Sequence, residues 1–435
     1  MTLASSPRFL LLLVFGLCLA LAIVGPVIQE PPVSWYGVGQ QLGLMAAFCF
    51  AYGVANRTVS WRGAPSIAAL PAASWIWIFL CIGIAGTCLQ LASKLSSMDS
   101  IGLEGFAVLR QQRAEQLLLS QPAVSARWAG LGFLAYPAGI VGCCAVLRCY
   151  EDMRGMHVLL VLVFLAGLVA LTVVAGGRGP LFAAAAVLVS TLALRKLDGR
   201  RAVPPSLTLR YIGIISALGF IAYSMMLWSV RSELSAMDAE RFLSNTEGAW
   251  GMSVRPEVRN LLEPLVGLEG LRMMVLSSFY LSQSFSVFER VASAPELPIM
   301  LGLYEVDALA AGYRVIVGAD AGLLATGNWA LLDLKVYGFF AGAWGSLVID
   351  FGFSGAIAAA LAWGWFAGRS WGAAARCPGM PVTFMLPYWC ASSLWSFASS
   401  PIGFSNAAVL LGWFVVAVAC IGRLKRSQAT AAGSI

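Results

Sequence analysis

The sequence predicts an all-α integral membrane protein that crosses the bilayer many times, and three observations carry this prediction. Of its 435 residues, 59% are hydrophobic and only 11% are charged. The apolar residues form runs of about 20 residues, the length that a helix needs to cross the hydrocarbon core. These runs lack the alternation of a barrel strand, and only helices and closed barrels satisfy every backbone hydrogen bond in lipid.

Ten runs are long and apolar enough to cross the bilayer. We expect about ten transmembrane helices, near residues 9–29, 37–55, 72–92, 128–147, 157–175, 180–194, 211–230, 338–367, 381–398 and 404–422. We interpret the first as a retained helix, because no small-residue cleavage site precedes Pro26. Two further stretches, 271–288 and 299–324, would raise the count to twelve. We favour membrane-surface or re-entrant helices there, because Arg272 and Gln283 are costly in lipid.

Basic residues set the expected orientation. An N-terminus in the cytoplasm places the short basic loops on the cytoplasmic side, as the positive-inside rule requires. These loops carry Arg57, Arg62, Arg148, Arg154, Arg195, Lys196, Arg200, Arg201, Arg210, Arg369, Arg376, Arg423, Lys425 and Arg426. The short outer connections 29–36 and 399–404 carry no Lys or Arg. Both termini are therefore expected in the cytoplasm.

The chain is expected to be one transmembrane domain, residues 1–435, because it shows no internal repeat and no linker. Two outer segments are long: a first loop at 93–127 and a large loop at 231–337. Long translocated loops escape the charge rule. Their arginines are therefore candidates for function.

Composition also argues against several classes of protein. The net charge of +7 is spread over many loops instead of forming one stripe, so nucleic-acid binding is not expected. Ten cysteines are present, but no CxxC pair occurs and most lie in apolar runs, which favours packing over metal or redox chemistry. The single histidine, His157, starts a predicted span and is not expected to be catalytic.

The sequence Gly176-Gly177-Arg178-Gly179-Pro180 separates two predicted helices on the outer side. Its glycines allow a tight turn, and Pro180 suits a helix start. The guanidinium of Arg178 presents a planar fork of donors suited to a phosphate or pyrophosphate. The alternative is an interfacial arginine that reaches to lipid headgroups, and the residues alone leave both interpretations open.

Two more candidates lie in the first outer loop. Arg110 and Arg113 are three residues apart, so both would lie on one face of a helix. Such a helix could rest on the membrane and present two cations to a lipid phosphate. A solvated basic face is the alternative.

Asp350 and Arg314 are the remaining candidates from the residues themselves. Asp350 is the only acidic residue within a predicted span, where a carboxylate usually faces a cavity or a cation. It could orient an arginine or accept a proton from an acceptor hydroxyl, although a helix-end carboxylate at the interface is the alternative. Arg314 follows small residues and Tyr313, which makes it the better candidate for ligand contact among the large-loop arginines.

Two stretches resemble one protein family. Gly176-Gly177-Arg178-Gly179-Pro180-Leu181 heads an apolar run, and Asn328 is followed by Ile349-Asp350-Phe351-Gly352-Phe353-Ser354-Gly355. Together they resemble the oligosaccharide repeat unit polymerases, the Wzy-type O-antigen polymerases. The arrangement extends over nearly the whole chain, but Val348 stands where an aromatic residue is common.

The resemblance implies a GT-C-like, metal-independent membrane glycosyltransferase without a cofactor, in the bacterial inner membrane. Its donor and acceptor would be undecaprenyl-pyrophosphate-linked oligosaccharides at the periplasmic face, and a chain-length regulator is a candidate partner. Arginines would stabilise the pyrophosphate leaving group. We assign catalysis to Arg178, Arg314 and Asp350, substrate binding to Arg110, Arg113, Tyr280, Arg290 and Tyr313, and no residue to a metal.

Two other functions remain as alternatives. An O-antigen ligase would share the topology and the arginines, but the ligase pattern includes a histidine in the large outer loop and this loop has none. A flippase or transporter of lipid-linked oligosaccharide predicts symmetric halves and charges along several helices. Neither feature is visible in the sequence.

Overall fold

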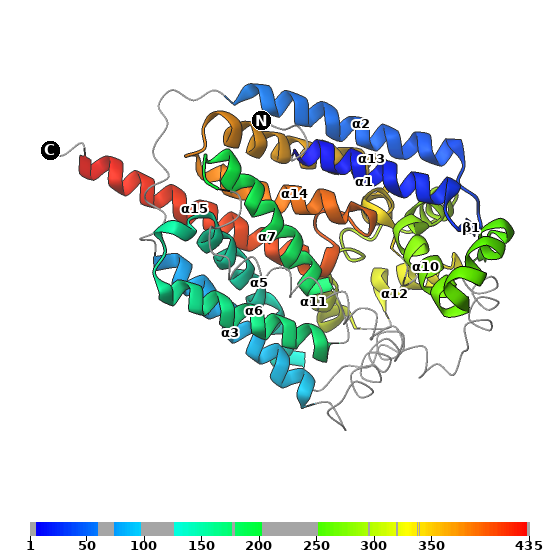
Figure 1. Cartoon of the computed structure of the whole chain (residues 1–435), viewed down its shortest axis with the longest axis horizontal. Helices are drawn as coiled ribbons and strands as arrows, with labels where there is room; N and C mark the ends of the chain where they lie inside the picture. The colour runs from blue at the N-terminus through cyan, green and yellow to red at the C-terminus, as the bar shows by residue number, and fades with distance from the viewer. Residues whose placement is uncertain are drawn as a thin grey trace.

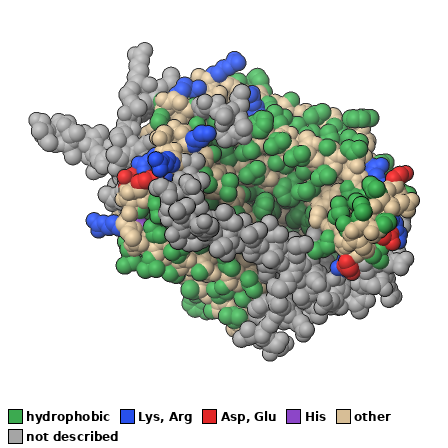
Figure 2. All heavy atoms as spheres, viewed as in Figure 1, with side chains coloured by type: hydrophobic (Ala, Val, Ile, Leu, Met, Phe, Trp, Pro, Cys, Tyr) green, Lys and Arg blue, Asp and Glu red, His purple; other side chains and the backbone are tan. Residues whose placement is uncertain are grey.

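The structure is a computed structural model, and it describes residues 6–59, 74–96, 126–175, 179–201, 251–294, 296–318, 321–336, 338 and 340–432. In this part of the chain the elements are almost all helices, and the long ones lie side by side as a bundle (Figure 1). In Figure 2 hydrophobic side chains cover the middle of the visible face, whereas charged side chains gather toward its two ends. This is the distribution expected of a multi-pass membrane protein.

Seven described helices are long and apolar enough to cross a membrane. They are α1 (Pro7–Val24), α2 (Trp35–Thr58), α3 (Ser74–Leu95), α5 (Ala126–Arg148), α6 (Gly155–Val174), α7 (Gly179–Leu197) and α13 (Gly342–Arg376). Each corresponds to a predicted span, with its ends shifted by a few residues, except that α13 runs on to Arg376, well past the predicted end at 367. The last helix, α15 (Ala407–Ala432), contains a shorter apolar stretch, Ala407–Arg423. The predicted span 211–230 lies outside the described residues.

The predicted span 381–398 is helical over 381–397, but it is not one regular α-helix. The segment is divided into η4 (Pro381–Met385), α14 (Leu386–Leu394) and η5 (Trp395–Phe397). Pro381 and Pro387 each begin one of the first two pieces, because proline lacks the N–H that a helix interior needs. Tyr388 and Trp395 are fully buried, and α14 packs against α7, α1 and α13. The short helix therefore lies inside the bundle.

Close helix pairs in the bundle depend on small residues. Gly364 and Gly368 of α13 lie against the backbone carbonyls of Phe48 and Tyr52 on α2, where a Cβ atom would collide with the partner backbone. Between α3 and α5, Gly83 lies against Gly139 in the same way. Small residues at such crossings let two backbones approach closely, which gives the packing contact that holds helices together in lipid.

The bundle has two distinct ends. At the first, here called the basic end, α1 begins and α2, α7 and α13 finish, and it contains Arg148, Arg195 and Arg376. At the second, the loop end, lie β1 (Val27–Gln29), β2 (Met252–Val254), α10 (Pro256–Ala292), α11 (Asp307–Val317) and α12 (Gly322–Asp333). The grouping of basic loops at one end agrees with the predicted alternation of the spans. Their position in the cytoplasm stays a prediction.

The two ambiguous stretches of the large loop do not form long apolar helices. Residues 271–288 form the second half of α10, which bends at Gly267 and packs against α1, α2 and α13. Residues 299–318 form a compact turn and then α11, and residues 322–324 begin α12. Val315 and Ile316 of α11 are 87% and 85% exposed, as expected for a helix lying at a membrane surface.

A small sheet was not expected. β1 pairs antiparallel with β2, with Val27 opposite Val254 and Gln29 opposite Met252. Three-residue strands carry too little periodicity to be read from the sequence. Their pairing joins the connection after α1 to the start of α10, and Arg255 reinforces this link by donating from Nε to the Gly25 carbonyl at 2.7 Å.

Candidate functional site

Asp350 holds a turn of the large loop against α13. Its Oδ1 accepts hydrogen bonds from the backbone N–H groups of Gly302 at 2.9 Å and Tyr304 at 3.0 Å, and its Oδ2 accepts one from Glu305 at 3.0 Å. The side chain is fully buried. No ion pair between Asp350 and an arginine occurs among the described residues. The expected arginine partner is thus replaced by three backbone donors.

A bend in α13 makes room for this turn. Gly352 has φ 64° and ψ 178° inside the helix, a conformation open essentially to glycine alone. The bend releases two helix carbonyls, which accept from the loop: Ile349 O from Met300 N at 3.2 Å, and Asp350 O from Leu301 N at 2.8 Å. The sequence Ile349-Asp350-Phe351-Gly352 is therefore an anchor for the turn at 300–305.

Glu305, which the sequence did not single out, fixes the other side of the turn. Its carboxylate accepts from Ser399 Oγ at 3.0 Å and Ser400 N at 3.3 Å, and it also contacts the Ser400 hydroxyl. Burial, with a smaller contribution from the neighbouring Asp350, raises the pKa of Glu305 to about 7 despite the lowering effect of the serine hydroxyls. A buried carboxyl that titrates near neutrality marks this place as a candidate functional site.

The start of α7 adjoins the same anchor. The helix begins at Gly179, so Pro180 lies in its first turn, as predicted. The Phe182 ring packs at 6.3 Å from Phe397 and at 5.6 Å from Phe404, on either side of the serines that bind Glu305. The start of α7 is therefore linked to Asp350 indirectly, through the 397–404 connection and Glu305, at the loop end.

Arg290 and Tyr280 lie on α10 at this end. Arg290 donates from Nη1 to the Lys335 carbonyl at 2.8 Å, and its Nη2 contacts the Glu30 carbonyl. Burial lowers the pKa of Arg290, and the Glu30 carboxyl partly offsets this effect. Tyr280 stacks at a tilt against Phe340, 5.8 Å between ring centroids. These contacts join α10 to the segment between α12 and α13, and their predicted role in substrate binding stays a prediction.

Tyr313 and Arg314 lie in α11. The Tyr313 hydroxyl accepts from Leu323 N at 2.9 Å and so fixes the start of α12 against α11. Arg314 is half-buried in the last turn, two turns after Asp307 on one face of the helix. Desolvation raises the pKa of the Asp307 carboxyl, whereas Arg314 lowers it.

Three predicted site residues, Arg110, Arg113 and Arg178, lie outside the described residues. Within the described part of the chain, no three His, Cys, Asp or Glu side chains are grouped so that they could hold a metal ion. None of the ten cysteines forms a disulfide, and six of them are buried. The prediction that most of them serve packing therefore agrees with the structure.

Comparisons of this chain with protein-family models, with curated proteins and with solved structures find no match.

Proposed function

We propose that this protein is a metal-independent membrane glycosyltransferase that joins lipid-pyrophosphate-linked oligosaccharide repeat units at the loop end. The observation that carries the proposal is an indirect link between two motifs. The helix that follows Arg178 packs through Phe182 beside the serines that bind Glu305, and Glu305 belongs to the turn that Asp350 holds. The helix that follows the first resembling stretch is thus linked to the second, while Arg178 itself lies outside the described residues.

The proposed chemistry is a displacement at an anomeric carbon. A hydroxyl of the acceptor oligosaccharide would attack this carbon, the bond to the pyrophosphate oxygen of the donor would break, and the hydroxyl proton would pass to water or to the departing pyrophosphate. Negative charge then grows on the leaving pyrophosphate, and preorganised guanidinium groups are suited to stabilise it. We assign this role to Arg178 and Arg314.

Asp350 takes a positioning role in this proposal. Both of its oxygens already accept backbone hydrogen bonds, and its side chain is fully buried. A general base must reach the proton that it removes. We therefore assign Asp350 to holding the turn that precedes α11, and thereby to placing Arg314.

Deletion of the gene in its host, followed by analysis of the surface polysaccharide, tests the function. A polymerase predicts caps of a single repeat unit on the surface. A full lipid-linked polymer that never reaches its acceptor would indicate a ligase, and loss of periplasmic lipid-linked units would indicate a flippase. Either of these two results contradicts the proposal.

Complementation with variants tests the site. Arg178→Ala and Arg314→Ala should abolish long chains while the protein remains folded in the membrane. Arg259→Ala is the matched control, because Arg259 lies on α10 in an exposed pair with Glu263 at 2.9 Å. An unchanged chain-length ladder in Arg178→Ala or Arg314→Ala would remove that arginine from the mechanism.

A further inference from the structure

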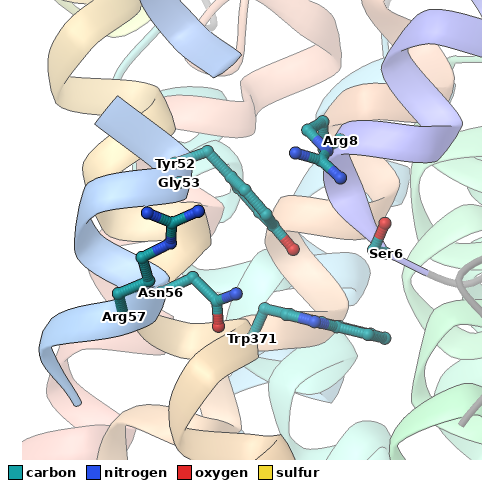
Figure 3. Close-up of a pocket in the computed structure, with 7 residues that line it drawn as sticks. All are labelled: Ser6, Arg8, Tyr52, Gly53, Asn56, Arg57 and Trp371. Carbon is teal, nitrogen blue, oxygen red and sulfur yellow. The ribbon is translucent and has the colours of Figure 1, made fainter. Parts of the chain in front are cut away.

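A cavity of about 240 Å³ opens at the basic end, far from the turn held by Asp350. It lies between the start of α1, the end of α2 and the last turns of α13 (Figure 3). One water needs only about 15 Å³ of such space. The cavity can therefore hold a group much larger than a single water. Its lining residues are Ser6, Arg8, Tyr52, Gly53, Asn56, Arg57 and Trp371.

The lining is cationic and has no acidic member. Arg8 and Arg57 come from two different helices and both border the cavity (Figure 3). Neither forms an ion pair with a carboxylate within the residues that the structure describes. Two positive charges in one cavity repel each other unless an anion lies between them.

A buried hydroxyl supplies an independent observation. Tyr52 is only 3% exposed, and its hydroxyl points into the cavity (Figure 3). The hydroxyl lies beside Ser6 without meeting the geometry of a hydrogen bond, and it has no other partner among the described residues. Leaving a buried polar group unpaired costs about 1–3 kcal/mol. A bound group that accepts or donates a hydrogen bond would remove this cost.

Other side chains hold the cavity open. Arg8 lies over the Tyr52 ring, 5.7 Å from its centroid, which fixes the guanidinium beside the hydroxyl. Arg376 donates from Nε to the Val59 carbonyl at 3.1 Å and also contacts Asn56, so the end of α2 is tied to α13. The Ser6 Oγ accepts from Phe9 N at 3.2 Å and caps α1, whose N-terminus adds positive potential.

We infer that this cavity binds a phosphate group, carried either by an anionic lipid headgroup or by a soluble phosphate compound. Two guanidinium groups, a tyrosine hydroxyl and the N-terminal end of a helix form a set of donors suited to an oxyanion with several acceptor oxygens. The inference does not depend on the proposed glycosyltransferase function, because the cavity and the turn held by Asp350 lie at opposite ends of the bundle.

Binding measurements on the purified full-length protein in detergent test the inference. The lipid probe is phosphatidic acid, with diacylglycerol of the same acyl chains as its phosphate-free control. The soluble probe is inorganic phosphate, with chloride at equal ionic strength as control. Native mass spectrometry counts bound lipid, and thermal stability titrations report both probes. Binding of phosphatidic acid alone identifies a lipid source, and binding of inorganic phosphate identifies a soluble source.

Matched variants separate the cavity from general attraction to the protein surface. The double variant Arg8→Gln/Arg57→Gln should weaken binding by about tenfold or more, and Tyr52→Phe by roughly threefold. Arg369→Gln is the control, because Arg369 is exposed on α13 near Trp371 but does not line the cavity. Equal losses in the double variant and in Arg369→Gln would overturn the inference, as would absence of binding by both probes. If the double variant fails to fold, an unchanged affinity in Tyr52→Phe overturns it instead.

Discussion

The two ends of the bundle hold buried carboxylates in opposite ways. At the basic end, Arg148 donates two hydrogen bonds to Asp198, from Nε to Oδ2 at 2.7 Å and from Nη2 to Oδ1 at 3.0 Å. Both side chains are almost fully buried. At the loop end, Asp350 and Glu305 are held by backbone N–H groups and serine hydroxyls.

The difference teaches that these ends respond differently to protons and to substitution. An arginine partner compensates the charge of a buried carboxylate, so removing either partner leaves a buried charge uncompensated. At the loop end, burial instead raises the pKa of Glu305 to about 7. The basic end is therefore expected to be held rigidly by the Arg148–Asp198 pair, whereas the stability of the loop end is expected to depend on pH.

The largest expected effect comes from removing the buried ion pair between Arg148 and Asp198. Asp198→Asn leaves the buried Arg148 guanidinium without its charge partner, which should lower the free energy of unfolding by about 3–5 kcal/mol. Denaturant titration in detergent micelles measures this loss. Asp152→Asn is the control, because Asp152 pairs with Arg200 on the surface and such pairs contribute about 0–1 kcal/mol. Equal effects of the two substitutions would contradict a special contribution of the Arg148–Asp198 pair to stability.

The second-largest effect is expected from changing Asp350, which holds the turn at the loop end. Asp350→Asn keeps one acceptor oxygen but turns an amide NH₂ toward at least one backbone N–H, which then loses its acceptor. The expected loss in the free energy of unfolding is about 2–3 kcal/mol, measured by the same titration. Asp333→Asn, on the exposed end of α12, should change it by less than about 0.5 kcal/mol. A loss no larger than this control's would show that the three hydrogen bonds contribute little.

The dependence on pH sharpens the comparison. Because the pKa of Glu305 is raised to about 7 from 4.5, the folded state holds its proton where the unfolded state has released it. This contribution to stability is complete below pH 4.5 and is lost as the pH rises through 7. Between pH 5 and pH 7 the free energy of unfolding should fall by roughly 2 kcal/mol on this account.

Glu305→Gln should flatten that dependence, because the amide does not titrate. Denaturant titrations of the original protein and this variant at several pH values measure the slope. A slope identical in both proteins would show that another group titrates.

The smallest expected effect comes from the bend in α13. Gly352→Ala forces an L side chain into a backbone conformation that costs about 1–2 kcal/mol, although the new Cβ would meet only the flexible Ile299 side chain, at 3.3 Å. Gly312→Ala is the control, because Gly312 lies within α11 with open space around its Cβ position and alanine favours a helix. If the two variants unfold at the same temperature, the backbone at position 352 accepts an alanine without strain.

Much of the architecture follows from the sequence because bilayer thickness imposes a length and a composition on every crossing helix. The seven long helices could be predicted for this reason. The segment 381–398 could not, because its hydropathy reports burial and does not separate lipid from protein interior. Glu305 gave no signal either, since its partners Ser399 and Ser400 are about a hundred residues away in the chain.

Sequence by itself determined where the apolar helices run, that basic loops alternate along the chain, and that Asp350 is unusual as an acid within an apolar run. Only the tertiary structure decided which charges find partners: Arg148 meets a carboxylate, Asp350 meets backbone N–H groups, and Arg8 and Arg57 meet a cavity. The physical reason is that the cost of burying a charge depends on the atoms within a few ångströms of it. Those atoms come from segments distant in the sequence.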